Sequence, residues 1–191
     1  MCGGEISRNC FVMLNRQPPA TPEQVMGTCL RLELEAAALY KRFEAASAEA
    51  ALRDLWASMA RAETHHAHLV AELANRRGFA VPAVPLSLLT AIVERTEAIR
   101  GEADASELTP DRMLGIAAAL EFSEMDDLFT AICRAAGVSA DGGRAEHLQP
   151  LVTAVLARQA GASVLPHLLA ALIRLDRRAE SGATAAAPSG Q

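Results

Sequence analysis

Residues 26–43 read MGTCLRLELEAAALYKRF, and this stretch carries both a helical pattern and its most informative exception. Its apolar residues recur at the three- and four-residue spacing of a helix that packs against a core. Glu33 falls inside that apolar stripe, among Leu30, Ala37 and Tyr40. A carboxylate buried there costs several kcal/mol unless a cation, hydrogen bonds or a proton compensates it. We therefore treat Glu33 as a candidate ligand of a positive ion.

Two later stretches repeat this exception. Glu63 lies on the apolar face of its own predicted helix, and His66 follows one turn further along that face. The spacing Glu-x-x-His allows a carboxylate and an imidazole to bind one ion. Glu121 and Glu124 lie among the apolar residues of the segment 114–128. Several helices would thus direct anionic groups and one imidazole toward a single interior, which is the arrangement that a metal site needs.

The composition favours one all-α domain. The chain has 191 residues, of which 51% are hydrophobic and only 4% aromatic, so it is long enough for one sizeable core and rich in helix formers. Its formal charge of −5 comes without a basic cluster, which argues against nucleic acid as a partner. No apolar run reaches the roughly 18 residues that a membrane helix needs, and no signal peptide is recognisable. We expect a soluble, cytoplasmic protein that does not enter a membrane.

The four cysteines show no metal-binding spacing. Cys2, Cys10, Cys29 and Cys133 are scattered, and none forms a C-x-x-C pair. A zinc ribbon or a rubredoxin-like iron site would need such pairs. We therefore expect free cytosolic thiols.

The first half of the chain predicts a helical hairpin after an irregular arm at residues 1–20. Thr21 is a predicted N-cap, with a proline next and Gln24 completing a capping box. Helical periodicity runs to about residue 47 and again from about 49 to 77, where a glycine ends it. A reversal near residue 47, inferred from length alone, would place Glu33 and Glu63 at about the same height of an antiparallel pair. The two carboxylates would then face each other.

The second half predicts a link at residues 78–109 with a short amphipathic helix at 87–100. A helix that begins at Thr109 and ends at Gly137 would carry both Glu121 and Glu124. Further helical patterns cover residues 144–159 and 163–180, and residues 181–191 are expected to form a disordered tail. The domain would span residues 21–180. The apolar face of the segment 163–180 would either dock back on the bundle or form a contact between chains. Since four helices can already close a core, we favour the contact and expect a homo-oligomer.

Three runs of residues resemble a known family. ELEAAALYKRF at 33–43, AETHHA at 62–67 and EFSEM at 121–125 are similar to the first three metal-bearing helices of rubrerythrins and the wider ferritin-like superfamily, over residues 22–136. The resemblance implies a ferritin-like antiparallel four-helix bundle, with residues 78–109 as a helical crossover and the segment 163–180 as an extra C-terminal helix. It implies one or two iron ions, or another divalent metal, and reduction of peroxide or oxygen with electrons from a separate donor. The implied ligands are Glu33, Glu63, His66, Glu121 and Glu124, with Glu63 as a candidate bridge between two metals.

The fourth helix departs from the family pattern. Rubrerythrins carry a second carboxylate motif there, whereas residues 150–153 read PLVT, and the segment 148–159 holds no carboxylate. Glu146 and His147 are the nearest donors, and His147, water or a neighbouring subunit would have to complete a metal shell. The protein would then reduce peroxide or oxygen, or carry iron without turnover.

A third hypothesis needs no metal. Arg144 or Arg158 would reach the acidic cluster and replace the charge of the metal with that of a guanidinium. The chain would then be a helical scaffold or interaction protein with a degenerate site.

Overall fold

The structure is a computed structural model that describes residues 18–105, 107–138 and 141–158, although not the side chains of residue 124, residue 126 and residues 141–147. The described residues form helices and no strands, which confirms the all-α prediction. The helices are α2 (Pro22–Ala46), α3 (Ala50–Asn75), α4 (Leu86–Asp104), α5 (Pro110–Glu121), α6 (Glu124–Ala135) and α7 (Asp141–Ala157). No helix among these described residues has the length and apolar character needed to cross a membrane.

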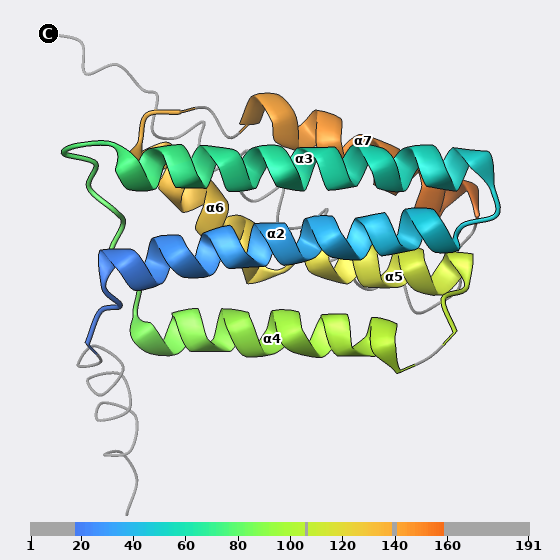
Figure 1. Cartoon of the computed structure of the whole chain (residues 1–191), viewed down its shortest axis with the longest axis horizontal. Coiled ribbons are helices and arrows are strands. Elements are labelled where there is room, and N and C mark those ends of the chain that lie inside the picture. The colour runs from blue at the N-terminus through green and yellow to red at the C-terminus, as the bar shows by residue number, and fades with distance from the viewer. Residues whose placement is uncertain (1–17, 106, 139–140, 159–191) are drawn as a thin grey trace, which may run out of the picture.

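Helices α2 and α3 form the predicted antiparallel hairpin, and their direct packing runs along the length of both helices (Figure 1). The predicted capping box is present: the Thr21 backbone N–H donates to Gln24 Oε1 at 2.8 Å, and the Gln24 N–H donates to Thr21 Oγ1 at 3.2 Å. At the other end, the buried hydroxyl of Ser47 donates to the Phe43 carbonyl and accepts from Trp56 Nε1 at 3.1 Å. Because Ser47 satisfies these buried groups, the chain reverses there without a glycine or a proline.

The link after α3 brings the chain back beside the start of α2. Gly78 has a φ of +75°, a left-handed conformation that favours glycine after a helix. The Ala20 N–H donates to the Val84 carbonyl at 2.8 Å, and the Leu86 N–H donates to the Pro18 carbonyl at 3.2 Å. Helix α4 follows where a shorter helix was predicted at residues 87–100, and it packs against α2 and α5. The helix predicted within the link 78–109 is therefore present, and it is longer than expected.

The segment predicted as one helix from Thr109 to Gly137 is two helices, so that prediction was wrong. Helix α5 ends at Glu121, and α6 begins at Glu124 after a break at residues 122 and 123. Ser123 caps α6, because its Oγ accepts a hydrogen bond from the Met125 N–H at 3.3 Å. The break therefore separates the two acidic residues that the sequence placed on one continuous face.

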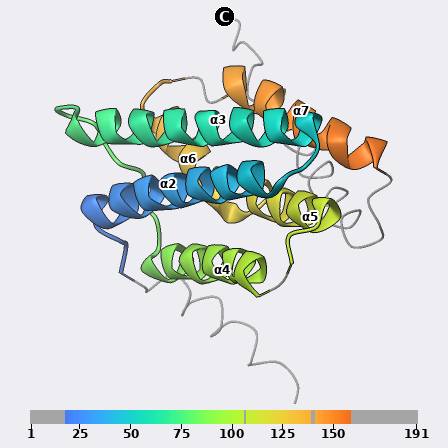
Figure 2. The same cartoon turned by 45° about the vertical axis from the view of Figure 1, so that its right-hand side comes forward.

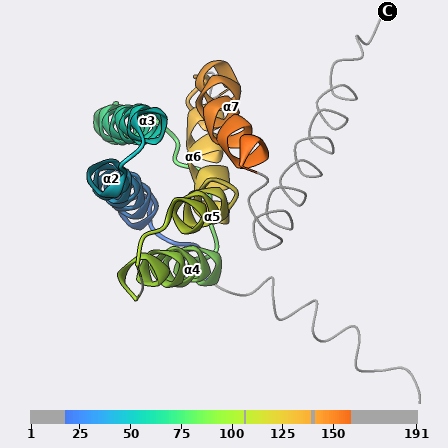
Figure 3. The same cartoon turned by 90° about the vertical axis from the view of Figure 1, so that its right-hand side faces the viewer.

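Helices α2, α4 and α7 run one way along the molecule, and α3 and α5–α6 run the other way (Figures 1 and 2). Viewed from the end, α2, α3, α5–α6 and α7 surround one interior, while α4 lies outside it beside α2 and α5 (Figure 3). Helix α7 turns Leu148, Leu151 and Val155 into this core and contains Pro150 on its exposed side. The predicted helix 163–180 and the tail 181–191 lie outside the described residues, as does most of the arm 1–20.

Candidate metal centre

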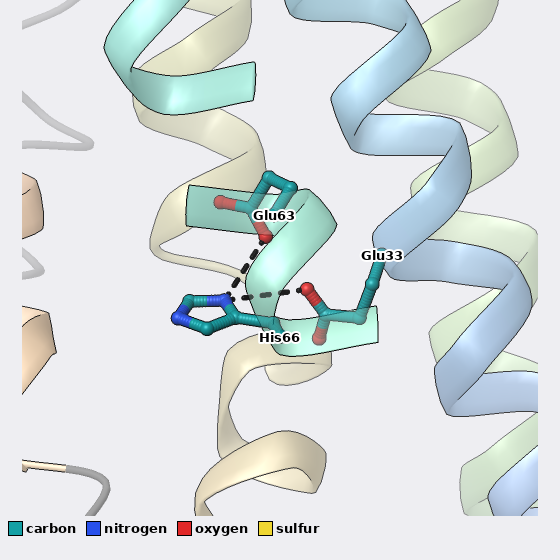
Figure 4. A group of neighbouring side chains, drawn as sticks. All are labelled: Glu33, Glu63 and His66. Carbon is teal, nitrogen blue, oxygen red and sulfur yellow. Dashed lines mark hydrogen bonds and ion pairs between the residues drawn. The ribbon is translucent and has the colours of Figure 1, made fainter. Parts of the chain in front are cut away.

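Glu33 of α2 and the pair Glu63 and His66 of α3 meet in the interior (Figure 4). His66 Nδ1 lies 3.2 Å from Glu63 Oε2 and 3.5 Å from Glu33 Oε2. The side chains of both glutamates are 2% exposed, whereas that of His66 is 17% exposed. The convergence predicted from the hairpin register is confirmed, and His66 forms the side of the cluster that is open to solvent.

Burial and mutual charge make this cluster hold a proton in the metal-free chain. Burial raises the pKa of Glu33 well above its usual range, and the neighbouring Glu63 adds to that shift, while interaction with His66 opposes it. For His66, burial alone would lower the pKa, but hydrogen bonding and charge attraction from Glu33 and Glu63 outweigh it and raise the pKa to about 10. A cation that entered the cluster would therefore displace a proton.

The residues present fit a single divalent ion. One oxygen from each glutamate and one ring nitrogen of His66 all lie within 4.8 Å of one another. Glu33 Oε2 is buried and makes no hydrogen bond among the described residues, although it lies at ion-pair distance from His66. A buried carboxylate oxygen in this state is a ready acceptor for a positive ion. Two carboxylates and an imidazole are donors that iron, manganese and zinc all accept.

The ring of His66 is held in place by α6. It stacks on Phe129, with ring centroids 4.3 Å apart and an angle of 29° between the planes. Phe129 is itself buried, so it fixes the orientation of the imidazole relative to the two carboxylates. The sequence pattern gave no reason to connect Phe129 with the site, because an apolar residue on a buried helix face ordinarily packs in the core.

Glu121 is buried near this cluster but is engaged by α2. The Tyr40 hydroxyl donates a 2.5 Å hydrogen bond to Glu121 Oε1, and the Tyr40 ring stacks on Trp56. Burial and the charges of Glu121, Glu63 and Glu33 raise the pKa of Tyr40 well above its usual range, so this hydroxyl keeps its proton. Tyr40 therefore supports a carboxylate of the interior, and that carboxylate is Glu121 rather than Glu33.

The remaining candidates, and the two histidines nearest to His66 in the sequence, have three different outcomes. The side chains of Glu124 and His147, which were also proposed as ligands, lie outside the described residues, and so does that of Arg144. Arg158 pairs with Glu49 and Asp111 rather than with the acidic cluster, so the proposal that it replaces a metal ion is wrong. His65 and His68, the neighbours of His66, are exposed on α3, as a helical face requires.

Two buried cysteines near the cluster were not predicted to belong to it. Cys29 Sγ lies 3.9 Å from Glu33 Oε1, one turn before it on α2. Burial, followed by the charges of Glu33 and of Cys133, raises the pKa of Cys29 well above its usual range. Burial, followed by the charge of Glu33, raises the pKa of Cys133 to about 11. The four-residue spacing from Cys29 to Glu33 was a readable signal, but nothing in the sequence paired α2 with Cys133.

Comparison with known proteins does not identify the function of this site. The chain matches no known protein family, and no curated protein or solved structure proved similar to it.

Proposed function

We propose that the chain binds divalent iron at Glu33, Glu63 and His66, and that it is a ferritin-like, rubrerythrin-like protein that reduces peroxide or oxygen at this site. The observation that carries the proposal is the buried Glu33 oxygen without a hydrogen bond, directed at a second buried carboxylate and an imidazole. Three convergent ligands are the number that catalytic metal sites use, because they leave further positions for water or a substrate. The order and direction of the helices also support the resemblance to ferritin-like proteins.

In this proposal each residue has a separate task. Glu33 and Glu63 supply the negative charge that holds the ion in a dry interior, and His66 supplies the nitrogen ligand on the accessible side. Iron, when bound, would supply the electrons that reduce the oxygen substrate. Phe129 orients His66, and Tyr40 fixes Glu121, which with Glu124 is the candidate donor for a second ion. A separate cytoplasmic electron donor and a homo-oligomeric assembly belong to the same proposal.

The direct test is the iron content of the full chain. We expect the chain, purified from iron-supplied cells and reloaded with iron(II) without oxygen, to hold at least one ion per chain. Glu63→Gln removes the charge of one ligand while keeping its size, and should lose the ion. Glu72→Gln is the matched control, because Glu72 is an exposed glutamate on the same helix. Metal content equal to that of the control in Glu63→Gln would refute the ligand set.

Iron binding alone does not distinguish an enzyme from an iron carrier. Peroxide consumption by the loaded chain, supplied with a chemical reductant, makes that distinction. Repeated turnover that disappears in Glu63→Gln supports the oxidoreductase. A loaded chain that consumes no more peroxide than free iron supports the carrier without turnover.

One observation favours a metal-free scaffold as the second candidate. The raised pKa of His66, about 10, means that a protonated imidazole can itself neutralise the neighbouring carboxylates at neutral pH. In that case the cluster would be a structural ion pair within the core. The metal-free scaffold would be supported if the chain took up no divalent metal and if iron, manganese and zinc left its thermal stability unchanged.

A further inference from the structure

Cys29 and Cys133 lie at the same level of the interior, beside the candidate metal centre. Cys29 precedes Glu33 by four residues on α2, and Cys133 follows Phe129 by four residues on α6, so each lies about 6 Å along its helix from the cluster. Because α2 and α6 run in opposite directions, both displacements point to the same end of the molecule, where α2 begins and α6 ends (Figure 1). The contact of His66 with Glu33 and Phe129 sets the two helices in this register.

The contacts and burial of the two thiols agree with that register. Both cysteines are 0% exposed and free. Helices α2 and α6 also pack directly against each other. Each thiol interacts electrostatically with Glu33, and Cys29 also interacts with Cys133. Both buried thiols therefore lie near Glu33, on the side of the centre where α2 begins and α6 ends.

We propose that Cys29 and Cys133 are an internal two-electron donor to the metal centre. This inference rests on the proposed function, and it identifies one source of electrons for the reduction within the chain itself. In the net reaction two S–H bonds and the O–O bond of hydrogen peroxide break, while one S–S bond and two O–H bonds form. The products are a disulfide and two water molecules, so both electrons and both protons come from the thiols. Cys29 Sγ donates to Glu33 Oε1 at 3.9 Å, so this thiol directly contacts a carboxylate of the centre.

Dependence on the metal separates this role from ordinary thiol oxidation. A fully buried thiol is inert toward an oxidant in solution. Peroxide should therefore oxidise the pair only when the centre beside it holds iron. A surface cysteine would not show this dependence.

The test uses the full chain with Cys2→Ser and Cys10→Ser, so that the two buried cysteines are the only thiols left. The iron-loaded chain receives one equivalent of peroxide without any other reductant, and is then denatured and alkylated. Mass analysis counts the blocked thiols, and peptide mapping identifies the disulfide. We expect most loaded chains to form the Cys29–Cys133 disulfide, and the same chain without iron to keep both thiols.

Variants and the iron content make the outcomes distinguishable. Cys133→Ala, checked for its helical content, should form no disulfide and, with peroxide in excess, should consume about one molecule of peroxide less per chain. Glu63→Gln, mixed with the same amount of iron, controls for oxidation by iron that is not bound. Loaded chains whose thiols stay reduced would overturn the dithiol and leave the metal site intact, and equal oxidation without iron would also overturn it. A chain that takes up no iron would refute the proposed function itself, and the dithiol donor with it.

Discussion

The hairpin α2–α3 and the segment α5–α6 both carry acids into the interior, but they present them differently. In the hairpin, two uninterrupted helices place Glu33, Glu63 and His66 within reach of one ion. In the other segment, the helix is interrupted directly after Glu121, and that carboxylate accepts a hydrogen bond from Tyr40. The acids on apolar sequence faces therefore do not all reach one ion, because Glu121 lies outside the three-ligand cluster. A regular helix preserves the spacing that the sequence encodes, and a break between the two acids changes it.

The largest expected difference between the two regions is in metal affinity. His66→Ala or Glu63→Gln should weaken iron binding by more than the 10–100-fold typical for the loss of a residue that only supports a ligand. Glu121→Gln should weaken it by roughly 10-fold or less, because Glu121 lies outside the three-ligand cluster. Competition against a metal chelator of known affinity measures all three variants.

A different order of affinities would show that the two regions share one metal site. An equal loss in Glu121→Gln and Glu63→Gln would place Glu121 among the ligands and favour two ions. A measured content of two iron ions per chain would independently favour a site that holds two ions. The single-ion description of the hairpin would then be replaced by the shared site that the resemblance implies.

The hydrogen bond between Tyr40 and Glu121 joins the two regions, and its loss should have the next largest effect. Tyr40→Phe keeps the ring that stacks on Trp56 and removes only the hydroxyl. A buried hydrogen bond to a charged group is worth about 1.5–3 kcal/mol, so we expect the free energy of unfolding to fall by about 2 kcal/mol. Urea denaturation of the metal-free chain measures it. A change within about 0.5 kcal/mol, as for a surface substitution, would show that this bond does not stabilise the fold.

The pH dependence of the metal-free chain tests the charge state of the hairpin cluster. Because the pKa of His66 rises from 6.5 to about 10 on folding, its proton contributes stability that is complete below pH 6.5 and is lost as the pH rises toward 10. The raised pKa of Glu33 acts in the same direction. We expect the urea midpoint, measured with a chelator present, to fall between pH 6.5 and 9. Measurements stop there because a thiol ordinarily begins to titrate near 9.

Histidine variants identify the source of this pH dependence. His66→Ala should remove the part of the fall that the imidazole contributes and leave the part that Glu33 contributes, whereas His68→Ala, an exposed position on the same helix, should keep the whole fall. Iron affinity should change in the opposite sense and weaken as the pH falls, because the ligands must lose protons to bind. Calorimetry in buffers of different ionisation enthalpy would detect the released proton. Iron binding without proton release would contradict the protonated cluster.

The sequence predicted those parts of the site that depend on regular helices. Glu33 and Glu63 could be placed at one height because helix length and one reversal fix it. The break after Glu121 was missed because the run EFSEM keeps the apolar spacing and contains neither glycine nor proline. Ser123 is a readable N-cap, but a serine inside a periodic segment is equally compatible with an unbroken helix. The neighbours Phe129 and Cys133 were missed because helix pairing comes from tertiary packing, which a single helix pattern does not contain.

The smallest expected effect concerns the break itself. Ser123→Ala removes the hydroxyl that accepts from the Met125 N–H, and loss of a cap typically costs about 1 kcal/mol of stability. Thr21→Ala, at the exposed start of α2, removes a comparable cap and should cost about the same. Neither variant should change iron affinity if the three ligands on α2 and α3 act alone. The two caps have the same chemistry and differ in their distance from the site. A loss of iron affinity in Ser123→Ala alone would therefore mean that the break positions a residue of α5–α6 as a ligand of the ion.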